Sequence, residues 1–370
     1  MKKTTYIISA KRTTIGKKGK SLQNVSVHEL GKSIIQKFPP TYTVANSLIM
    51  GTVLQTGLGA NIARQVALSS GLGVESTAQT VNMVCGSGLY AVHLASQKLQ
   101  LNEANVVIAG GAESMSQAPN YGQENKSTLL NDALIDPFRH YHMGITAENV
   151  AQKYQISRKD QDEFAVNSHL KSDNAWKKGY FDSEVVFINN LVKDESIRPD
   201  TSEKQLATLK PVFLPNGTVT AGNAAPLSDG ASFLLMANQN GINEYSLHPM
   251  AQIIDYQEVG FKPELMGYAP YFAIKKLLQK NKLQISDIDL FEINEAFAAQ
   301  CIAVARDLNI PMEKLNINGG SLALGHPLGA SGARILTTLV HNLKRKNLEF
   351  GIASLCIGGG MACAVLVHNQ

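Results

Sequence analysis

Apolar and polar positions alternate in short segments along the first 118 residues. Apolar runs at 5–9, 47–54 and 105–109 predict buried strands, and the residues after the last run read GGAESMS. Residues 27–38 and 61–70 carry apolar side chains at helical spacing. Strands that alternate with helices are typical of a layered α/β fold.

The stretch TVNMVCGSGLYAVHLASQKL places a cysteine between two such elements. Residues 80–84 predict a short buried strand, and the apolar spacing from 89 to 99 predicts a helix, so Cys85 lies at the junction. Free N–H groups and the positive dipole at a helix start stabilise an anion. We therefore expect the pKa of Cys85 to lie below the usual value of about 8.5. Taken alone, the stretch is better explained as a small buried cysteine before a helix, because free cysteine is among the most buried residue types.

The middle of the chain has a different character. Residues 121–219 are polar and show one clear helical segment, 159–178, and the apolar strand pattern returns at 227–237. We interpret the polar part as an insertion that carries binding loops. The predicted units are an N-terminal α/β half at 1–118 completed by 227–245, an inserted loop domain at 119–226, and a C-terminal α/β half at 246–370.

The last third repeats the first in outline. LFEINEAFAAQ at 290–300 and LNINGGSLALGHPLGASGAR at 315–334 each read as a strand or turn followed by a helix, in the order seen earlier. The uncharged residues 350–367 approach the length of a membrane-spanning helix. Three glycines at 358–360 interrupt them, so a hairpin of two buried strands is the better interpretation.

Composition narrows the class of protein. The chain has 370 residues, 44% hydrophobic and 17% charged, with a net charge of +4, which suits a soluble protein with two or three core-bearing units. Basic residues do not interleave with aromatic ones, so neither a nucleic-acid partner nor a membrane partner is expected. TTYIISA between the early lysines is too short for a signal peptide. Four widely spaced cysteines predict no disulfide framework and no metal site, and they suit a reducing cytoplasm.

Three glycine-rich clusters accompany Cys85 at predicted strand ends, which converge on one cleft in many α/β folds. His326 facing a thiol can take its proton, although a lone histidine is often structural. Asn294 opens a helix, so capping is as good an explanation for it as function. Cys356 before three glycines suits a base or plain packing. We assign Cys301 and Cys363 to packing.

These motifs together resemble the signatures of the thiolases. They are CGSG at 85–88, NEAFAAQ at 294–300, NGG-x-x-x-x-GHP-x-GASGAR at 318–334 and CIGGGM at 356–361. HMGITAENVA at 142–151 and GTVTAGNA at 217–224 are similar to the biosynthetic, short-chain branch. The resemblance covers the whole chain. It implies an αβαβα fold of two similar halves and an acetyl-CoA C-acetyltransferase that needs no cofactor, because coenzyme A (CoA) is a substrate and product.

The resemblance also implies roles for single residues. Cys85 matches the acyl-carrying nucleophile, Cys356 the acid/base cysteine, His326 the residue that activates Cys85, and Asn294 the holder of an oxyanion-hole water. The N–H groups of Cys85 and Gly358 match a second oxyanion hole, for the acyl oxygen. The positions that match CoA-binding residues are Leu134, His142, Met143, Arg198, Phe213, Ala221, Ala225, Leu227, Met266, Ala296 and Phe297. Ala225 replaces the usual serine and cannot make its side-chain hydrogen bond to CoA. We therefore expect a lower affinity for CoA and a retained activity.

Three other functions compete with this interpretation. A thiolase of fatty-acid breakdown takes longer acyl chains, but Met143 and Met266 match residues that narrow the acyl pocket. A ketosynthase or a hydroxymethylglutaryl-CoA synthase places His or Glu where this chain has Cys356. A non-catalytic acyl-CoA or lipid-binding protein has no need for all four reactive side chains.

Assembly and redox chemistry are further expectations. The family implies a homodimer, and its tetrameric members add a hairpin before the HMG motif. Residues 121–141, including Glu124, lack the alternating apolar pattern of a hairpin, which predicts a dimer and not a tetramer. Because Cys85 and Cys356 must reach the same acetyl group, we expect their sulfur atoms to lie close together, and mild oxidation to join them reversibly.

Overall fold

One mixed sheet of 11 strands runs through the structure, a computed structural model that describes residues 4–121 and 126–370. Its strands are β1 (Thr5–Thr13), β2 (Gly16–Lys17), β3 (Ser47–Gly51), β4 (Thr77–Val81), β5 (Val106–Ser114), β8 (Val185–Val186), β9 (Ser228–Asn238), β10 (Ala251–Gly260), β11 (Leu290–Ile293), β12 (Phe350–Ile357) and β13 (Met361–Asn369). The order along the sheet is β11-β12-β13-β10-β1-β9-β5-β3-β4, with β2 and β8 beside it on β9 and β1.

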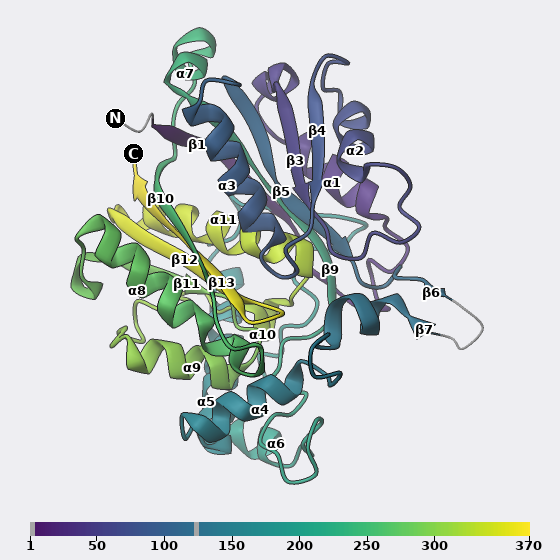
Figure 1. The fold of residues 1–370 in the computed structure, drawn as a ribbon, viewed down its shortest axis with the longest axis vertical. Helices are drawn as coiled ribbons and strands as arrows, with labels where there is room; N and C mark the ends of the chain where they lie inside the picture. The colour runs from purple at the N-terminus through teal and green to yellow at the C-terminus, as the bar shows by residue number, and fades with distance from the viewer. Residues whose placement is uncertain (1–3, 122–125) are drawn as a thin grey trace.

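The two ends of this sheet have the same strand pairing. β3 runs parallel to β5 and β11 runs parallel to β12. β5 then pairs antiparallel with β9, as β12 does with β13. The two half-sheets meet where β1 pairs with β10 (Figure 1). This pairing confirms the internal repeat that the sequence predicted, and the hairpin over residues 350–367 is β12–β13.

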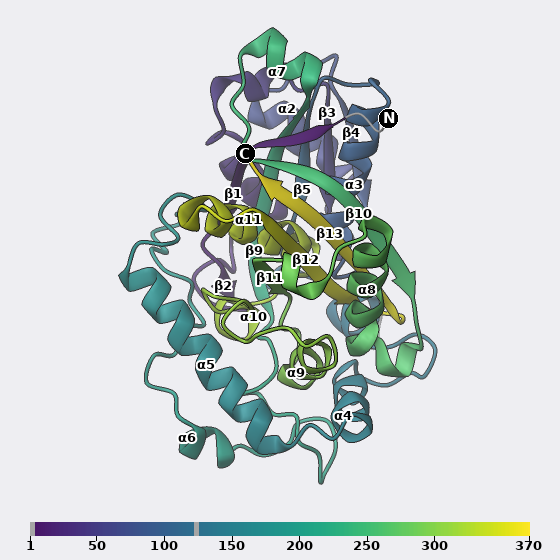
Figure 2. The ribbon, with the colours of Figure 1, turned by 90° about the vertical axis from the view of Figure 1, so that its left-hand side faces the viewer.

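Helices complete five layers. They are α1 (Val27–Ile35), α2 (Ile62–Ser70), α3 (Ser87–Gln100), α7 (Gln239–Tyr245), α8 (Ala269–Asn281), α9 (Ala298–Asp307), α10 (Ser321–Leu324) and α11 (Leu328–Lys346), with short turns η1 (Pro40–Val44), η3 (Pro263–Tyr268) and η4 (Ile285–Asp287). α1 and α2 pack outside the first half-sheet and α8 outside the second. α11 contacts strands of both half-sheets and also contacts α3, so these two helices lie between the sheets (Figure 2). The predicted αβαβα arrangement is confirmed.

Two glycines allow the starts of α3 and α11 to touch. A Cβ on Gly88 would lie 2.8 Å from the Gly329 carbonyl oxygen, and one on Gly332 would lie 2.5 Å from the Leu89 nitrogen. Only glycine permits backbones to approach this closely. The first turns of the two helices therefore pack together, which brings Cys85 and His326 to the same place in the fold.

The polar insertion is more ordered than its sequence indicated. It contains β6 (Asn120–Tyr121), β7 (Lys126–Ser127), η2 (Leu130–Leu134), α4 (Gly144–Lys153), α5 (Arg158–Lys177) and α6 (Glu203–Ala207). α5 is the predicted helix, whereas α4 and α6 were missed. α6 has only five residues, too few for a periodicity to show.

Two further expectations were wrong. β6 and β7 pair antiparallel, so a short hairpin is present in the segment where none was predicted. Strands of two residues carry no alternation for a sequence pattern to detect. Residues 122–125, with Glu124, lie outside the described residues. The strand before Cys85 ends at Val81 rather than Val84 and lies at the sheet edge, because its partly exposed residues pair only with β3.

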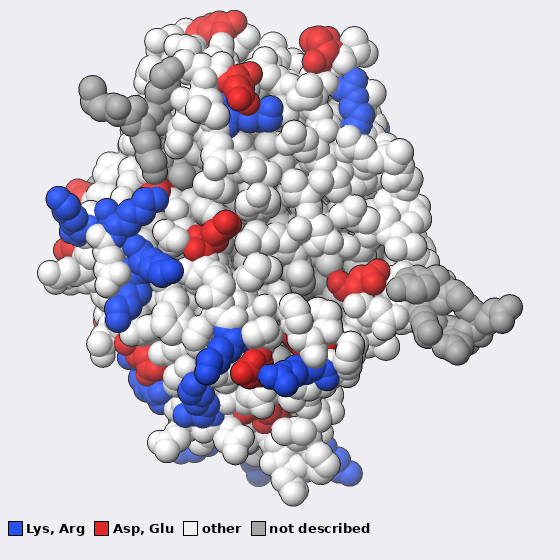
Figure 3. Space-filling view, in the orientation of Figure 1, with Lys and Arg blue, Asp and Glu red and all other residues white. Residues whose placement is uncertain are grey.

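On the face in Figure 3, basic side chains gather near α8 and acidic ones are interspersed among them. Among residues 4–121 and 126–370, every helix is too short or too polar to traverse a bilayer.

Candidate active site

Cys85 lies in a strained turn between β4 and α3. Val84 has a φ of +48°, a left-handed conformation that is unusual for a β-branched residue. Hydrogen bonds of the neighbouring residues hold this turn: the Ser87 hydroxyl donates to the Val84 carbonyl at 2.7 Å and accepts the Met83 N–H at 2.8 Å. Strain of this kind persists where surrounding structure fixes it, and it is concentrated at functional sites.

His326 stands immediately before α11, and its ring is fixed by Ser331. The Ser331 Oγ donates to the Pro327 carbonyl at 2.8 Å, so it accepts the proton of His326 Nδ1 at 2.6 Å. That tautomer leaves a lone pair on Nε2. Burial, followed by the nearby Arg334 charge, lowers the pKa of His326 to about 3. The imidazole is therefore neutral and able to accept a proton at Nε2.

Asn294, directly after β11, lies against the other side of that ring. Its Nδ2 is 3.5 Å from His326 Nε2. Its Oδ1 accepts the Ser321 hydroxyl at 2.6 Å and an Arg334 N–H at 3.4 Å. These two donors fix the orientation of the amide, so its N–H groups face the histidine side. The explanation of Asn294 as a helix cap does not hold, because the residue before α9 is Phe297.

Cys356 is the next-to-last residue of β12, and the glycine turn follows it. The N–H groups of Gly358 and of Cys85 itself donate to the Cys85 sulfur. The resemblance implies a role for the same two N–H groups as donors to the acyl oxygen. Burial raises the pKa of Cys356, and the nearby Cys85 sulfur raises it further.

The expected low pKa of Cys85 is wrong. Burial raises the pKa of this thiol to about 12, and the two backbone N–H groups offset only part of that effect. The side chain is 6% exposed, so a thiolate there would lose nearly all of its hydration. Cys85 is consequently a thiol until another group takes its proton.

Most of the predicted residues line one cavity of about 250 Å³. Those from the sequence-based set are Cys85, Leu134, His142, Met143, Phe213, Ala225, Leu227, Met266, Ala296, Phe297, His326 and Cys356. His142 stacks on Phe213 with ring centroids 4.6 Å apart, and Phe297 meets Phe213 edge-on. We call this space the reactive cavity. Asn294 and Gly358 are not among its lining residues.

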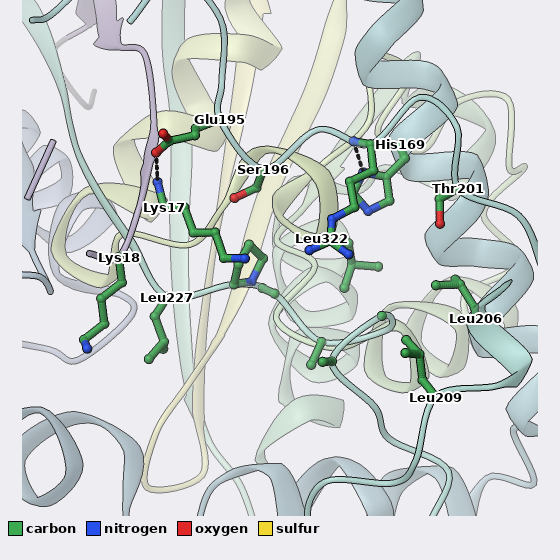
Figure 4. Close-up of a pocket in the computed structure, with 16 residues that line it drawn as sticks. Lys17, Lys18, His169, Glu195, Ser196, Thr201, Leu206, Leu209, Leu227 and Leu322 are labelled. Atoms are coloured by element: carbon green, nitrogen blue, oxygen red, sulfur yellow. Dashed lines mark hydrogen bonds between the residues drawn. The ribbon is translucent and has the colours of Figure 1, made fainter. Parts of the chain in front are cut away.

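Arg198 and Ala221 line a second cavity, of about 450 Å³ (Figure 4). The two cavities share the wall residues Ala224, Ala225, Pro226 and Leu227. We call this second space the adjoining cavity. Its other lining residues include Lys17, His169 and Ser196, which the sequence analysis did not single out.

Supporting residues around the site were also missed. Glu113 is buried and accepts the N–H groups of Val53, Leu54 and Gly329, so it connects the first half to the start of α11. Ser331 orients His326. Both residues belong to motifs that were recognised, GGAES and GHPLGASGAR, and the spacing from His326 to Ser331 was the available signal. The described residues contain no cluster of His, Cys, Asp and Glu arranged to hold a metal ion.

Comparison with known proteins shows that both halves of the chain match models of the same family. The family model "Thiolase, N-terminal domain" matches residues 5–240, and "Thiolase, C-terminal domain" matches residues 247–369. A probable acetyl-CoA acyltransferase of Staphylococcus aureus is 43% identical, with 98% of each chain covered.

Solved structures agree with these matches. The acetyl-CoA acetyltransferase of Bacillus anthracis has a TM-score of 0.94 and 39% identity, with 100% of this chain and 99% of that chain covered. Human mitochondrial 3-ketoacyl-CoA thiolase in complex with CoA has a TM-score of 0.96 and 38% identity, with 100% and 98% covered.

The fold and the site thus define an acyl-transferring enzyme built on two fused α/β halves. The chain belongs to the thiolase family and is an acyltransferase. Thiolases use CoA as a substrate and need no further cofactor.

Proposed function

We propose that this enzyme is an acetyl-CoA C-acetyltransferase, which joins two acetyl-CoA molecules to acetoacetyl-CoA and CoA in a reversible Claisen condensation. The observation that carries the proposal is that two thiols and a neutral imidazole, Cys85, Cys356 and His326, line one small cavity. Condensation needs one group to carry an acetyl and another to remove a proton from the second acetyl-CoA.

In the first half of the reaction, His326 Nε2 takes the proton of Cys85 while the sulfur attacks the thioester carbonyl. The N–H groups of Cys85 and Gly358 donate to the developing oxyanion. Collapse breaks the bond to CoA, and Cys356 gives its proton to the departing CoA thiolate. Burial raises the pKa of Cys356, which supports this step because the residue begins as a thiol. Acetyl-Cys85, protonated His326 and a Cys356 thiolate remain.

In the second half, the Cys356 thiolate removes a methyl proton from the second acetyl-CoA. Protonated His326 and a water held by Asn294 donate to the enolate oxygen. The enolate carbon attacks acetyl-Cys85, the bond to sulfur breaks, and Cys85 recovers its proton from His326. Both cysteines are thiols again at the end, so the cycle closes.

We also propose that residues 119–226 act as the CoA-binding loop domain between the halves at 1–118 with 227–245 and at 246–370. Seven of the matched positions come from this segment and line the two cavities: Leu134, His142, Met143, Arg198, Phe213, Ala221 and Ala225. The CoA complexes of the human enzyme and of the Acat5 thiolase from Ascaris suum support a CoA site in this fold.

The second candidate is a 3-ketoacyl-CoA thiolase for longer chains, which the name of the human relative favours. Met143 and Met266 on the wall of a cavity of about 250 Å³ favour short chains. The test is CoA-dependent cleavage of 3-ketoacyl-CoA substrates of four, six and ten carbons, with the Cys85→Ser variant as control. We expect the highest kcat/KM for acetoacetyl-CoA. A higher value for the ten-carbon substrate would establish the second candidate instead.

For assembly we propose a homodimer that does not go on to a tetramer, in a reducing cytoplasm where the four free thiols persist. The shortness of β6 and β7 supports the dimer, because two paired residues offer little backbone to a second dimer. Light scattering at micromolar concentration decides it, and a mass of four chains of 40.0 kDa would contradict it.

A further inference from the structure

A buried arginine lies next to the active site without lining the reactive cavity. Arg334 belongs to α11, is 1% exposed, and is absent from the cavity wall. Its Nη1 is 3.8 Å from a Glu292 carboxylate oxygen, which is too far for a hydrogen bond. Its Nε and Nη1 make no hydrogen bond to any residue that the structure describes. A buried charge that is incompletely paired costs stability, and a well-packed apolar side chain would serve the fold at least as well.

The hydrogen bonds that this guanidinium does make converge on Asn294. Within residues 4–121 and 126–370, all of them come from Nη2, which donates to Ser321 Oγ at 2.8 Å and to Asn294 Oδ1 at 3.4 Å. The Ser321 hydroxyl in turn donates to Asn294 Oδ1 at 2.6 Å. Arginine has donors and no acceptor, so the serine oxygen accepts from it and the serine proton is left for the amide. The direction of both bonds is thereby fixed.

The Asn294 amide has a reason to turn over during the proposed reaction. At rest, His326 Nε2 carries a lone pair and lies 3.5 Å from Asn294 Nδ2, so an amide N–H faces an acceptor. Once His326 holds the proton of Cys85, Nε2 is a donor and faces another donor. An amide free to rotate would then turn its carbonyl oxygen toward the histidine, because a hydrogen bond replaces a contact between two donors.

We infer that Arg334 and Ser321 are positioning residues that prevent this rotation of Asn294 while His326 is protonated. The inference rests on the proposed function, because protonated His326 is a state of that reaction. Rotation would turn the amide NH2 group toward the guanidinium, which cannot accept a hydrogen bond. Because arginine keeps its proton in proteins, it holds the amide in the same orientation throughout the cycle.

The consequence concerns condensation more than acetylation. In the second half of the reaction, protonated His326 and the water that we assign to Asn294 both donate to the enolate oxygen. A rotated Asn294 would accept the histidine proton with its carbonyl oxygen, and the enolate would lose both donors. In the first half His326 begins as an acceptor, so no such rotation is favoured before Cys85 is deprotonated.

The experiment measures the two half-reactions separately. Rapid quenching and intact-protein mass spectrometry give the rate of Cys85 acetylation, and a coupled assay of acetoacetyl-CoA gives condensation. For Arg334→Met we expect condensation to fall about thirty-fold, since the hydrogen bonds of a charged donor are lost. For Ser321→Ala we expect a fall of about five-fold, the effect of a neutral hydrogen bond. Acetylation should stay within about three-fold of the native rate in both variants.

Two control variants match these substitutions. Arg345→Met changes an exposed arginine further along α11, whose guanidinium donates to Asn342. Ser172→Ala removes a buried hydroxyl that donates to the Asn318 carbonyl at 3.2 Å. Both variants should keep the native ratio of the two rates, because neither side chain contacts Asn294.

A double-mutant cycle shows whether Arg334 acts through Asn294. Arg334→Met added to Asn294→Ala should lower condensation by no more than about two-fold beyond Asn294→Ala alone, because no amide is left to orient. Losses that multiply in the double variant would overturn the inference, since Arg334 would then act by a route that does not include Asn294.

Thermal stability separates positioning from a structural role. Arg334→Met replaces an incompletely paired buried charge with an apolar side chain, so its Tm should equal or exceed that of the native chain. Glu292 does not require the arginine as a partner, because burial raises the pKa of its carboxyl to about 8 and it is mostly protonated at pH 7. A lower Tm together with equal losses of acetylation and condensation would show a structural role and overturn the inference.

Failure of the inference and failure of the proposed function are distinguishable. If the native enzyme neither forms nor cleaves acetoacetyl-CoA, the proposed function fails. If it does so, and Arg334→Met and Ser321→Ala slow acetylation as much as condensation, the inference fails and the proposed function stands. If Arg334→Met does not fold, the ratio of the two rates in Ser321→Ala decides the question.

Discussion

The turn that carries Cys85 and the turn that follows Cys356 reach the same cavity by different backbone routes. Cys85 follows Val84, whose φ is +48°, and its sulfur accepts two backbone N–H groups. Cys356 lies in a regular strand next to the glycine turn, and its sulfur accepts only its own N–H. Burial raises the pKa of both thiols. The more strained turn thus carries the sulfur with more N–H donors, which suits a nucleophile, while the other suits a proton carrier.

The largest expected effect comes from removing the Cys85 sulfur, which accepts two backbone N–H groups. Cys85→Ser should lower kcat about 10⁴-fold, because a hydroxyl there is a far weaker nucleophile. Intact-protein mass spectrometry after incubation with acetyl-CoA should show one acetyl group on the native chain and none on the variant. Cys301→Ala, at a buried cysteine outside the cavity, should keep the adduct. An acetyl group found on Cys356 would reverse the two roles.

Removal of the second sulfur should separate the half-reactions. Cys356→Ala should still form the acetyl adduct but lose condensation about 10³-fold, the range of a general base. Exchange of acetyl methyl protons with deuterated water should disappear in parallel. Exchange at the native rate in this variant would move the base to another residue.

A third substitution removes the side-chain amide of Asn294. Asn294→Ala should lower kcat about 10²-fold, because it removes the amide that we propose as the holder of the oxyanion-hole water. Stopped-flow kinetics should show condensation affected more than acetylation, because we assign Asn294 to the enolate. Equal losses in both steps would place its role with Cys85.

The glycine turn can be perturbed more mildly. A Cβ on Gly358 would lie 2.5 Å from Met143 Cε, so Gly358→Ala should shift the N–H that donates to Cys85. We expect acetylation to slow about ten-fold. Gly260→Ala is the control, because a Cβ there meets nothing within 4 Å. Unchanged acetylation in Gly358→Ala would show that this N–H does not contribute.

The smallest expected effect is on stability. The folded chain keeps His326 and His169 neutral, with pKa values of about 3 and 4, whereas an unfolded histidine titrates near 6.5. Below pH 6.5 the unfolded state binds more protons, so the free energy of unfolding should fall with pH by about 1.4 kcal/mol per unit per histidine. This loss should continue down to about pH 4.

Urea unfolding at pH 7, 6 and 5 measures that slope. His326→Asn should make it shallower, and His248→Gln, at an exposed histidine, should leave it as in the native chain. The same slope in His326→Asn and in the native chain would contradict the buried neutral state.

The sequence by itself determined the order of most elements and the residues that we propose as reactive. Three features could be recognised in this way: the repeat of strand and helix, the β12–β13 hairpin and the four signatures. Each depends only on residues that are close together in the sequence. The starts of α3 and α11 can pack together only because they contain glycine, and these glycines belong to the recognised motifs. The motifs therefore also explain why Cys85 and His326 line the same cavity.

Only the tertiary structure decided the electrostatics and the second cavity. Helix-start reasoning predicted a low pKa for Cys85, and burial by residues from distant segments reversed its sign. The tautomer of His326 depends on how Ser331 shares its proton with the Pro327 carbonyl. Lys17, His169 and Ser196 lie far apart in the chain and form one lining only after folding. Desolvation and convergence depend on what surrounds a group in three dimensions, and a sequence pattern records only its neighbours along the chain.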